Sequence, residues 1–425
     1  MPACRVCSQS IAPFISLGRM PVANAFLRRD AFAEEFFFNL AVAFCPACGM
    51  VQLTEQVDRD RLFHPDYAYF SSLSAGMVRH FTSYAEQVLR EHASGDDPFI
   101  VEIGSNDGIA CRHFSAAGVR HLGVDPSENV CAVARAKGVQ TLCRFFDEEA
   151  GSDIRRDFGP ADVIVSANVI THVPDLHTLV RGVCNLLSER GVFVIEEPYL
   201  GSIVANTAYD QFYAEHGYYF SLLALTSLFA RHELEVVDVS AQPTHGGSMR
   251  YVVARRGQRA VSQAVEDLRA RERESGLHQH ATYEAFAGRI LHSRDALRSL
   301  LGDLKRANRR VTGYGATAKS TTVTNFCGLG PDDIEYISDT TPGKQGTFSP
   351  GMHIPVVAPD GFHARYPDHA VLFAWNHCAE IVAKEQGFRA AGGSFIEYVP
   401  SVGLMSWDRA GLAAPSPTGP ATRDS

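Results

Sequence analysis

The sequence predicts an α/β protein made of a doubly wound, Rossmann-like domain, a small cysteine-rich domain before it, and a second Rossmann-like α/β domain after it. Short apolar runs alternate with helical patterns between residues 98 and 256, as they do in βαβ units. The same alternation resumes at residue 310. Two Cys-x-x-Cys pairs stand apart from both stretches, within the first 60 residues.

Composition excludes several classes of protein. The chain has 425 residues, of which 45% are hydrophobic and 20% charged, as in ordinary globular proteins. Its net charge of −9 leaves no basic surplus for non-specific binding of nucleic acid. The N-terminus lacks the basic and apolar regions of a signal peptide, and no segment approaches the roughly 20 apolar residues of a membrane span. We therefore expect a cytoplasmic protein whose partners include neither nucleic acid nor membrane.

The first domain, expected at residues 1–65, contains two cysteine pairs, Cys4 with Cys7 and Cys45 with Cys48. Such pairs offer four thiolates in the tetrahedral arrangement that zinc requires. Unligated thiols or a redox pair would use the same residues, but a chain this long without an export signal argues against a disulfide scaffold. We expect a structural zinc ion, because a closed four-sulfur site leaves no open position for catalysis.

The second domain is expected at residues 66–256. It begins with a helical pattern over 67–90, where apolar residues recur every three or four positions. Seven strands follow, with helices between the first five, and this order predicts a doubly wound sheet that ends in an antiparallel hairpin. The expected strands are 99–104, 121–125, 141–145, 161–168, 191–197, 234–240 and 249–255.

A connector and a third domain complete the chain. Residues 257–308 are polar and periodic, and they predict a long helix or a helix pair. The third domain is expected at 309–410, with a helix that begins at Ala318. The end of the chain, 411–425, is rich in Pro, Ser and Thr and predicts a disordered tail. The strands expected in the third domain are 310–315, 334–339, 354–357, 369–376 and 394–400.

Polar and glycine residues follow the first four strands of the second domain, at the edge where open α/β sheets bind ligands. The first strand ends in Glu102-x-Gly104-x-x-x-Gly108, where glycine permits a sharp turn close to a ligand. Asp125, at the tip of the second strand, can accept both hydroxyls of a ribose. The spacing departs from that of NAD sites and favours S-adenosylmethionine, with an empty or different pocket as the alternative. The expected cofactor-binding residues are Glu102, Gly104, Asn106, Gly108, Asp125, Phe146, Asp147 and Asn168.

The stretch DQFYAEHGYYFS (210–221) combines dense aromatic residues with Tyr213, Glu215 and His216. Histidine is the usual general base near neutral pH, and a neighbouring carboxylate can raise its basicity, although consecutive side chains need not face each other. Tyr213 can hydrogen-bond a substrate carbonyl or its developing oxyanion. On composition alone, aromatic packing with exposed charges is the simpler interpretation.

Two glycine-rich turns are candidate anion sites. HGGSMRY (245–251) offers the hydroxyl of Ser248 and the guanidinium of Arg250 to a diphosphate, but it suits a β-hairpin turn equally well. GYGATAKS (313–320) leads from a strand to a helix start near Lys319. It lacks the P-loop spacing, but it stays a candidate anion site because the amides at the helix N-terminus can donate to an anion.

These elements, in this order, resemble a family, the S-adenosylmethionine-dependent C-methyltransferases of nucleotide-activated deoxysugars. The resemblance covers almost the whole chain, and the combination is far more specific than any single motif. Besides the four cysteines and the Tyr-x-Glu-His group, it is carried by PVANAF (21–26), CGMVQL (48–53), EIGSNDG (102–108), NVITHVPDLH (168–177), EEPYL (196–200), HGGSMR (245–250), GYGATAKS (313–320), KQGTFSPGMHIPV (344–356) and AWNH (374–377).

The resemblance implies a zinc-binding domain, a class I methyltransferase domain and a C-terminal Rossmann-like substrate domain. It implies as substrate a 4-keto-deoxysugar linked to a nucleoside diphosphate, typically dTDP, in deoxysugar and antibiotic biosynthesis. His216 then removes a proton beside the ketone, with C3 as the first expectation, and the enolate takes the methyl group. Tyr213 and Glu215 are its implied hydrogen-bonding companions, and His172 lies near the ketone. The substrate-binding residues expected are Tyr67, Ser248, Arg250, Lys319, Asn376 and His377.

One residue departs from the family's usual Tyr-His-Glu-His, because Ala214 replaces the first histidine. This bears on which sugar is used and on whether C3 or C5 is methylated. An O- or N-methyltransferase would share the cofactor domain and could use His216 on a hydroxyl, but solvent deuterium would not exchange beside a ketone. A non-catalytic scaffold is the third alternative, and against it stand four intact residues, Glu102, Gly104, Asp125 and His216. The oligomeric state stays open, with a monomer favoured.

Overall fold

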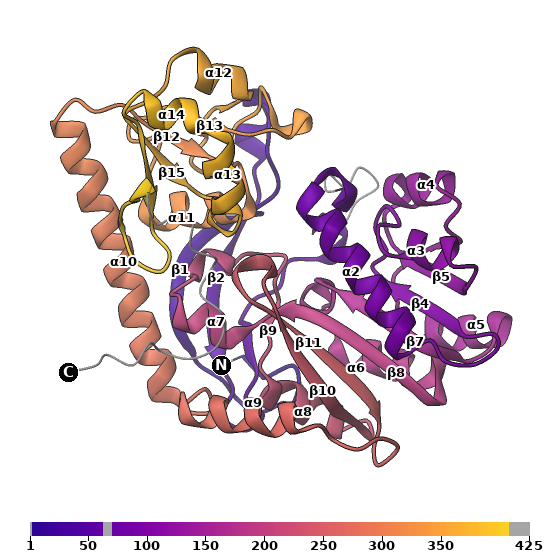
Figure 1. The fold of residues 1–425 in the computed structure, drawn as a ribbon. Coiled ribbons are helices and arrows are strands. Elements are labelled where there is room, and N and C mark those ends of the chain that lie inside the picture. Colours follow the sequence, from indigo (N-terminus) through magenta and orange to yellow (C-terminus); the bar gives the residue numbers. More distant parts are fainter. Residues whose placement is uncertain (1, 63–69, 408–425) are drawn as a thin grey trace.

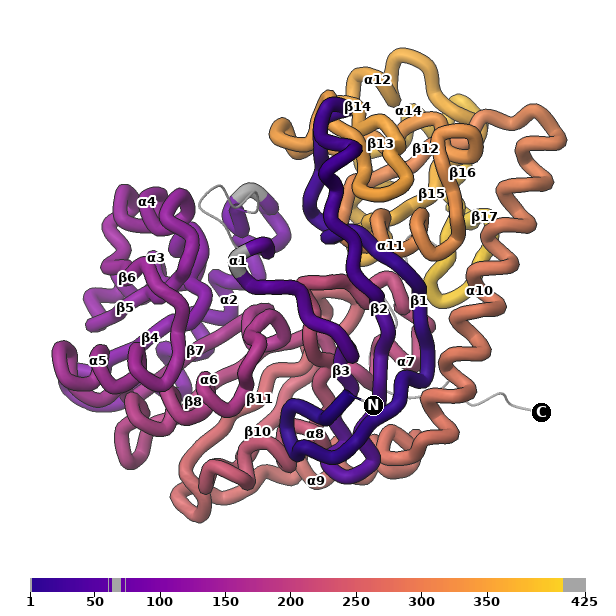
Figure 2. The backbone as a smooth tube through the Cα atoms, turned by 180° about the vertical axis from the view of Figure 1, so that it is seen from behind, coloured from indigo at the N-terminus to yellow at the C-terminus, as the bar shows by residue number. Residues whose placement is uncertain are grey.

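The computed structural model describes residues 2–62 and 70–407, and three β-sheets follow one another along the chain (Figure 1). A four-stranded sheet belongs to the N-terminal region, a seven-stranded sheet to the middle and a six-stranded sheet to the C-terminal region. The N-terminal strands extend from the middle region to the C-terminal region in both views (Figures 1 and 2). This architecture confirms the predicted α/β class with two Rossmann-like parts.

The N-terminal sheet is antiparallel and includes a strand from elsewhere in the chain. That strand, β9, comes just after His216 and pairs with β3. The sequence did not predict this pairing, because a two-residue strand carries no periodicity. The sheet order is β1 (Pro13–Pro21), β2 (Phe37–Phe44), β3 (Val51–Leu53) and β9 (Tyr218–Tyr219).

The middle sheet has the order β10-β11-β8-β7-β4-β5-β6, with β11 antiparallel to both neighbours and the other pairs parallel. This confirms the doubly wound sheet and its terminal hairpin. The carboxyl ends of β4, β5 and β7 therefore meet at one edge. The strands are β4 (Phe99–Ile103), β5 (Arg120–Asp125), β6 (Thr141–Cys143), β7 (Ala161–Ala167), β8 (Leu187–Pro198), β10 (Leu234–Gln242) and β11 (Ser248–Arg255).

Helices cover both faces of this sheet, with a separate apolar cluster on each face (Figure 1). Successive residues of β7 point to opposite faces, so that Val163 and Val165 pack under α2 while Ile164 packs under α5 and α6. The helix α2 buries the predicted stripe of apolar residues. The helices are α1 (Arg59–Leu62), α2 (Ala75–Glu91), α3 (Cys111–Ala116), α4 (Glu128–Ala136), α5 (Glu148–Phe158), α6 (Leu176–Leu186), α7 (Leu200–Ala205) and α8 (Leu222–Ala230).

The lengths of several strands differ from the sequence prediction. β6 ends at Cys143 rather than at 145, and β8 begins at Leu187 rather than at 191. β13 comprises only Ile337–Ser338, where the pattern predicts six residues. The sequence pattern reports only which residues are apolar, whereas a strand ends where its neighbour stops pairing with it. β13 pairs with β12 and β14 over only two residues.

The connector is a helix pair, as predicted, and the longer helix α10 runs along the N-terminal and C-terminal regions (Figures 1 and 2). The C-terminal sheet has the order β14-β13-β12-β15-β16-β17, parallel except for β17. The elements are α9 (Gln263–Glu274), α10 (His280–Arg306), β12 (Val311–Tyr314), α11 (Ala318–Cys327), β13, β14 (Val356–Val357), α12 (Pro359–Ala364), β15 (His369–Leu372), α13 (Cys378–Lys384), α14 (Gln386–Ala390), β16 (Ser394–Glu397) and β17 (Gly403–Leu404).

The N-terminal sheet, α10 and the C-terminal sheet share one apolar core. The ring of Phe44 stacks on Tyr283 of α10 with centroids 4.3 Å apart. The predicted domain limits stay predictions, because β9 and this shared core connect the regions. Within the described parts of the chain, the helices are too short or too polar to cross a membrane. Tyr67 and the predicted tail at 411–425 lie outside the described residues.

Candidate functional site

The four predicted zinc ligands come together in the N-terminal region. The Sγ atoms of Cys4, Cys7, Cys45 and Cys48 all lie within 4.8 Å of one another. Cys4 and Cys48 are 3.5 Å apart, and Cys7 and Cys45 are 3.4 Å apart. A tetrahedral zinc–sulfur bond of about 2.3 Å requires sulfur atoms about 3.8 Å apart, so the cluster has the size of a zinc site.

Neighbouring groups favour the thiolate form of Cys4, whereas burial raises the pKa of Cys45 to about 11. The backbone N–H of Val6 and the Nε2 of Gln52 donate to the Sγ of Cys4 at 3.4 and 3.1 Å. The hydrogen bond with Cys48, helped by these donors, lowers the pKa of the Cys4 thiol to about 4. Thiolate is the form that binds zinc. The residues therefore fit a structural zinc ion, since protein sulfur takes all four positions.

Two buried carboxyl groups lie at the carboxyl edge of the middle sheet. Glu102, at the end of β4, is 3% exposed, and its Oε2 accepts the backbone N–H of Cys111 at 3.1 Å. Burial raises the pKa of Glu102 to about 8. Asp125, at the end of β5, accepts the backbone N–H groups of Asn106 and Ser127 at 2.9 and 3.0 Å. Backbone amides thus fix both carboxyl groups on adjacent strands.

The loop after β4 requires unusual backbone angles. Gly104 and Gly108 have φ of 73° and 77°, and Asn106 has φ of 48°. A Cβ at Gly104 would lie 2.3 Å from the Cγ2 of Val169, so that only glycine fits. Asn168 also has positive φ, and its buried Oδ1 lacks a hydrogen-bond partner among the described residues. An unpaired buried acceptor beside this turn fits a polar, adenosine-type ligand.

The third strand end of this edge carries Phe146 and Asp147. Phe146 is buried, as the wall of an adenine pocket would be. The Oδ1 of Asp147 accepts the backbone N–H of Ala150 at 2.9 Å and caps the N-terminus of α5. Asp147 therefore has a structural contact that the sequence analysis did not foresee, and its contact with a cofactor stays a prediction.

The predicted base lies in a buried group of aromatic rings. The Oη of Tyr213 lies 2.7 Å from the Nε2 of His216, and the ring of His172 lies 5.2 Å from that of His216. Burial lowers the pKa of His216 well below its usual value, and the nearby His172 and Lys319 lower it further. Burial also lowers the pKa of His172 to about 4. Both imidazoles are neutral at pH 7, which is the form that accepts a proton.

Glu215 points away from His216. Its Oε1 accepts the backbone N–H and the Nδ2 of Asn24 at 3.3 and 2.9 Å, and burial raises its pKa. The expectation that Glu215 hydrogen-bonds to His216 is therefore wrong in the described chain, because consecutive side chains diverge here and the N-terminal region takes the carboxylate. Ala214 is buried in the apolar core beside Phe212.

The HGGSMR turn is the hairpin between β10 and β11. The Oγ of Ser248 donates to the carbonyl of Thr244 at 3.1 Å. Arg250 is 5% exposed, and its Nη2 and Nε donate to the Oε2 of Glu196 at 2.6 and 3.0 Å. His80 contacts the other oxygen of that carboxylate at 2.6 Å. The structure does not support the predicted diphosphate clamp, because Glu196 already pairs with the Arg250 guanidinium.

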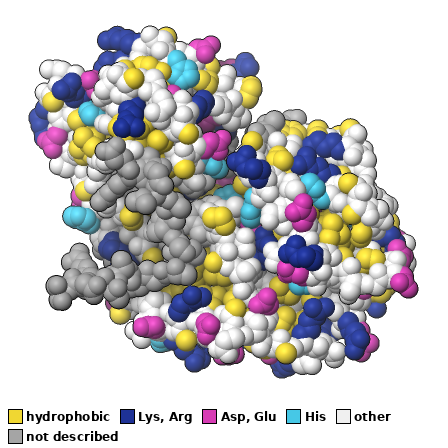
Figure 3. All heavy atoms as spheres, in the orientation of Figure 1, with side chains coloured by type: hydrophobic (Ala, Val, Ile, Leu, Met, Phe, Trp, Pro, Cys, Tyr) yellow, Lys and Arg dark blue, Asp and Glu magenta, His cyan; other side chains and the backbone are white. Residues whose placement is uncertain are grey.

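Lys319, at the start of α11, lies beside the predicted base. Burial lowers its pKa, and the nearby Asp210 opposes this effect. The Lys319 charge in turn lowers the pKa of His216, His245 and His377. Because charge effects of this kind weaken with distance, the lysine and the three histidines lie close together. Figure 3 shows histidine, lysine and arginine side chains around the indentation where the C-terminal lobe meets the middle region.

Asp210, which the sequence patterns do not single out, joins the middle and C-terminal regions. Its buried Oδ2 accepts the Nε1 of Trp375 at 2.6 Å and the Oη of Tyr398 at 2.7 Å. Trp375 also covers Gly246, where a Cβ would lie 2.2 Å from the indole. Asn376 lies in the same short 3-10 helix. Asp210 opens the aromatic stretch, but the contact spans 165 residues, which no local pattern reveals.

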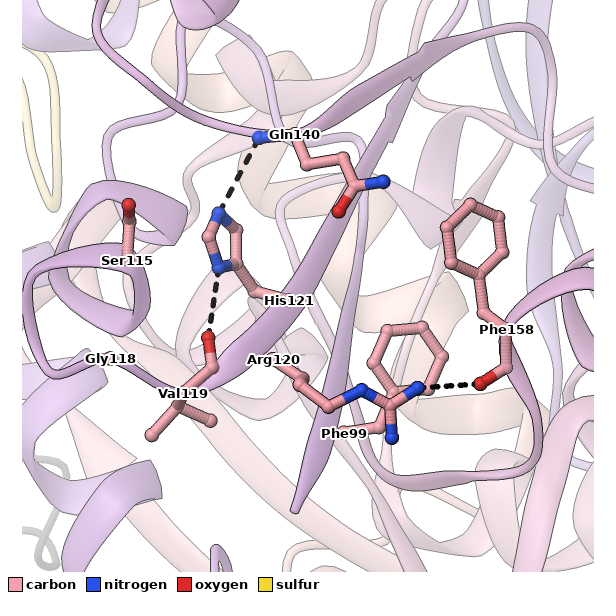
Figure 4. A pocket seen from close by; sticks show the side chains of 8 residues that line it. All are labelled: Phe99, Ser115, Gly118, Val119, Arg120, His121, Gln140 and Phe158. Carbon is pink, nitrogen blue, oxygen red and sulfur yellow. Dashed lines mark hydrogen bonds between the residues drawn. The ribbon is translucent and has the colours of Figure 1, made fainter. Parts of the chain in front are cut away.

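A separate pocket lies at the opposite edge of the middle sheet, where β4 and β5 begin at Phe99 and Arg120 (Figure 4). Its polar groups contact the protein itself. Arg120 donates to the carbonyl of Phe158 at 2.7 Å, and His121 lies 3.0 Å from the carbonyl of Val119. Because ligands of open α/β sheets bind at the carboxyl ends of strands, this pocket is no candidate for the cofactor.

The fold and the cysteine cluster define a class I methyltransferase with a zinc-binding N-terminal domain. Three family models match successive parts of the chain: a zinc binding domain over residues 4–63, a methyltransferase domain over 78–239 and a C-methyltransferase C-terminal domain over 243–400. The chain belongs to the family of S-adenosylmethionine-dependent C-methyltransferases, and it is an enzyme that uses S-adenosylmethionine as its cofactor.

Among curated proteins, the chain is similar to the C-methyltransferase NovU of Streptomyces niveus, at 35% identity over 95% of this chain and 96% of NovU. This decides against the O- and N-methyltransferase alternatives. Among solved structures, it matches a methyltransferase from Anabaena variabilis at 17% identity and TM-score 0.33, over 41% of this chain and 84% of that one. It also matches the magnesium protoporphyrin IX methyltransferase of Synechocystis at 14% identity and TM-score 0.34, over 43% and 84%.

Proposed function

We propose that the enzyme methylates the carbon beside the ketone, C3, of a 4-keto-deoxysugar linked to a nucleoside diphosphate, typically dTDP, with His216 as the base. One observation carries this proposal: a buried imidazole whose Nε2 lies 2.7 Å from the Oη of Tyr213. C-methylation needs a carbon nucleophile. A ketone supplies one, because it makes the neighbouring C–H acidic enough for an imidazole to deprotonate.

The protonation states of the site suit this step. His216 is neutral because burial lowers its pKa, and it can therefore take a proton from the sugar. The resulting imidazolium lies beside the newly formed enolate, whose negative charge raises the pKa of His216 and offsets the effect of burial. Once Nε2 has taken the proton, it can donate to the Oη of Tyr213, and this frees the hydroxyl hydrogen of Tyr213 for the developing oxyanion. The ring of His172 lies 5.2 Å from that of His216.

The carboxyl edge of the middle sheet would hold the cofactor. Asp125 would accept the ribose hydroxyls, and Gly104 and Gly108 let the backbone approach the ligand closely. The unpaired Oδ1 of Asn168 offers one more acceptor. When bound there, S-adenosylmethionine supplies the electrophilic methyl group that the carbanion takes. Glu102 and Phe146 line the same edge.

The C-terminal region would hold the anionic end of the substrate. Lys319 brings a positive charge close to His216 and His377, and a diphosphate there would be attracted to it. Asn376 can add a neutral hydrogen bond. Since Arg250 is paired with Glu196, Lys319 becomes the principal candidate for the diphosphate contact.

His216→Ala tests the assignment, with the exposed His280→Ala on α10 as the matched control. Each protein is assayed against a panel of dTDP-4-keto-deoxysugars, and NMR locates the new methyl group at C3 or C5. We expect turnover to fall by about 10²–10⁴-fold, because a general base is lost. Solvent deuterium exchange beside the ketone should stop, while S-adenosylmethionine affinity stays at the wild-type value. Continued exchange in His216→Ala, or loss of cofactor binding, would overturn the assignment.

A further inference from the structure

The side chain of Arg5 spans the distance from the cysteine cluster to the residues that follow His216. Its Nη2 donates to the carbonyl of Gly217 at 3.0 Å, its Nε donates to the Oη of Tyr218 at 3.0 Å, and its Nη1 donates to the carbonyl of Leu53 at 2.8 Å. The guanidinium also lies over the Tyr218 ring, 4.8 Å from the centroid. All three guanidinium nitrogens are therefore used, in a rigid plane that a lysine cannot imitate.

The cysteine cluster fixes the backbone from which Arg5 extends. Arg5 lies between Cys4 and Cys7, so a zinc ion held by both would constrain its main chain. Its backbone N–H donates to the Oε1 of Gln52 at 3.0 Å, and the fully buried Gln52 donates through Nε2 to the Sγ of Cys4 at 3.1 Å. The metal cluster and the guanidinium thus share one rigid support.

The segment that Arg5 contacts is held on both sides of His216. After the histidine, the N–H of Gly217 donates to the carbonyl of Thr171 at 2.8 Å, one residue before His172. Before it, Glu215 accepts the Nδ2 of Asn24 at 2.9 Å. The N-terminal region therefore contacts both neighbours of His216, and the imidazole itself faces Tyr213.

We propose that Arg5 is a positioning residue that holds the His216 imidazole against Tyr213 and thereby connects the zinc-binding domain to catalysis. This inference rests on the proposed role of His216 as the base. The contacts of Arg5 go to the chain around the base, and the cofactor edge lies on β4 and β5. Its loss should therefore lower kcat and leave cofactor affinity unchanged. A misplacement of about 1 Å in a catalytic group costs about 100-fold in rate.

Arg5→Ala and Arg5→Lys test the proposal, with Arg19→Ala as the matched control. Arg19 is an exposed arginine of β1 in the same region, and its guanidinium also lies over an aromatic ring, that of Phe37. Four measurements are made on the full chain: zinc content, S-adenosylmethionine affinity, steady-state kinetics that give kcat and KM separately, and amide hydrogen exchange across residues 213–220. We expect wild-type zinc content and cofactor affinity, faster exchange in the segment and a kcat about 100-fold lower.

Chemical rescue separates positioning from general damage. Methylguanidinium in the buffer should restore part of the kcat of Arg5→Ala and should leave the kcat of His216→Ala unchanged. Without any added compound, Arg5→Lys should be little more active than Arg5→Ala, because an ammonium group cannot replace the planar guanidinium. Unchanged exchange, faster exchange with normal kcat, or loss of zinc in both variants would each overturn the proposal. If Arg5→Ala fails to fold, Arg5→Lys provides the same comparison. Turnover that survives His216→Ala would instead remove the proposed base, while exchange across 213–220 still reports on the Arg5 contacts.

Discussion

At the scale of single residues, burial decides the charge of the groups around the site. Burial lowers the pKa of His216 and His172 and raises the pKa of Glu102 to about 8, so that all three favour their neutral forms near pH 7. The sequence identified these residues by type and spacing. It contained no information on their protonation, because desolvation depends on the atoms that surround each group in the folded chain.

Glu197 gives a testable case of this effect. Its Oε1 accepts the N–H groups of Val169 and Ile170 at 2.9 and 2.8 Å, and burial raises its pKa from 4.5 to about 8. The folded protein therefore binds a proton that the unfolded chain releases between these values. The stabilisation of the folded state by this proton on Glu197 is fully present below pH 4.5 and is lost as the pH rises through 8.

Glu197→Gln stays neutral and keeps an acceptor for both amides. The wild type loses stability as the pH rises through this window, whereas the neutral glutamine does not. We therefore expect the free energy of unfolding of Glu197→Gln, minus that of wild type, to increase by about 1.4 kcal/mol per pH unit. Denaturant unfolding at several pH values measures the difference. Glu189→Gln, an exposed change on the same strand, controls for removing a charge. A constant difference between Glu197→Gln and wild type from pH 5 to pH 8 would contradict the expectation.

At the scale of elements, the strand–turn–helix unit after β4 combines local and long-range requirements. The sequence showed that glycine recurs there, and the structure shows why: φ is positive at Gly104 and the side chain of Val169 fills the space where a Cβ would stand. Val169 follows β7, the neighbouring parallel strand. The glycine therefore serves both the turn and the close approach of two loops at the carboxyl edge of the sheet.

Gly104→Ala should lower stability by about 1–3 kcal/mol, because alanine must adopt positive φ and displace Val169. It should also weaken S-adenosylmethionine binding, since the loop would move. Gly288→Ala is the matched control: this glycine lies inside α10, its added Cβ would meet nothing within 4 Å beyond the adjoining backbone of its own helix, and the change should stabilise by about 0.5–1 kcal/mol. Thermal unfolding and calorimetric titration measure both effects. Equal cofactor affinity in the two variants would argue against the loop's role.

At the scale of the whole molecule, the candidate active site lies where three regions of the chain meet. The middle sheet supplies the candidate cofactor edge, the N-terminal region reaches the segment of the proposed base through Arg5, and the C-terminal region contributes Lys319 and Trp375. The pairing of β3 with β9 joins the zinc-binding sheet to the segment that contains the proposed base, His216. Removing one region would therefore disturb the site even where its own residues remain.

Asp210→Ala tests the junction with the C-terminal region. The change leaves the buried donors of Trp375 and Tyr398 without their acceptor, and each unpaired group costs about 1–3 kcal/mol. Denaturant unfolding followed by tryptophan fluorescence measures the loss, and KM for the proposed sugar-nucleotide substrate should rise because Trp375 lies beside Asn376. Asp303→Ala removes a surface partner of Arg306 and should cost at most about 1 kcal/mol. Equal stability of the two variants would contradict the prediction.

Most of the fold was predictable because its signals are local. Alternating apolar runs identified the strands of both Rossmann-like parts, a spacing of three or four residues identified α2, and paired Cys-x-x-Cys motifs identified the zinc ligands. The ends of β6 and β13 were less predictable, because a neighbouring strand decides where pairing stops.

The sequence by itself determined the class of protein, the four-cysteine cluster and which residues stand at the carboxyl edge of the middle sheet, since each depends on residue types at short spacing. Only the tertiary structure decided the direction of Glu215, the pairing of Arg250 with Glu196, and the reach of Arg5 to the segment after the base. Each of these partners lies far away in the sequence. A side chain contacts the group that packing places beside it, and packing across 54 to 212 residues leaves no periodic pattern in the sequence.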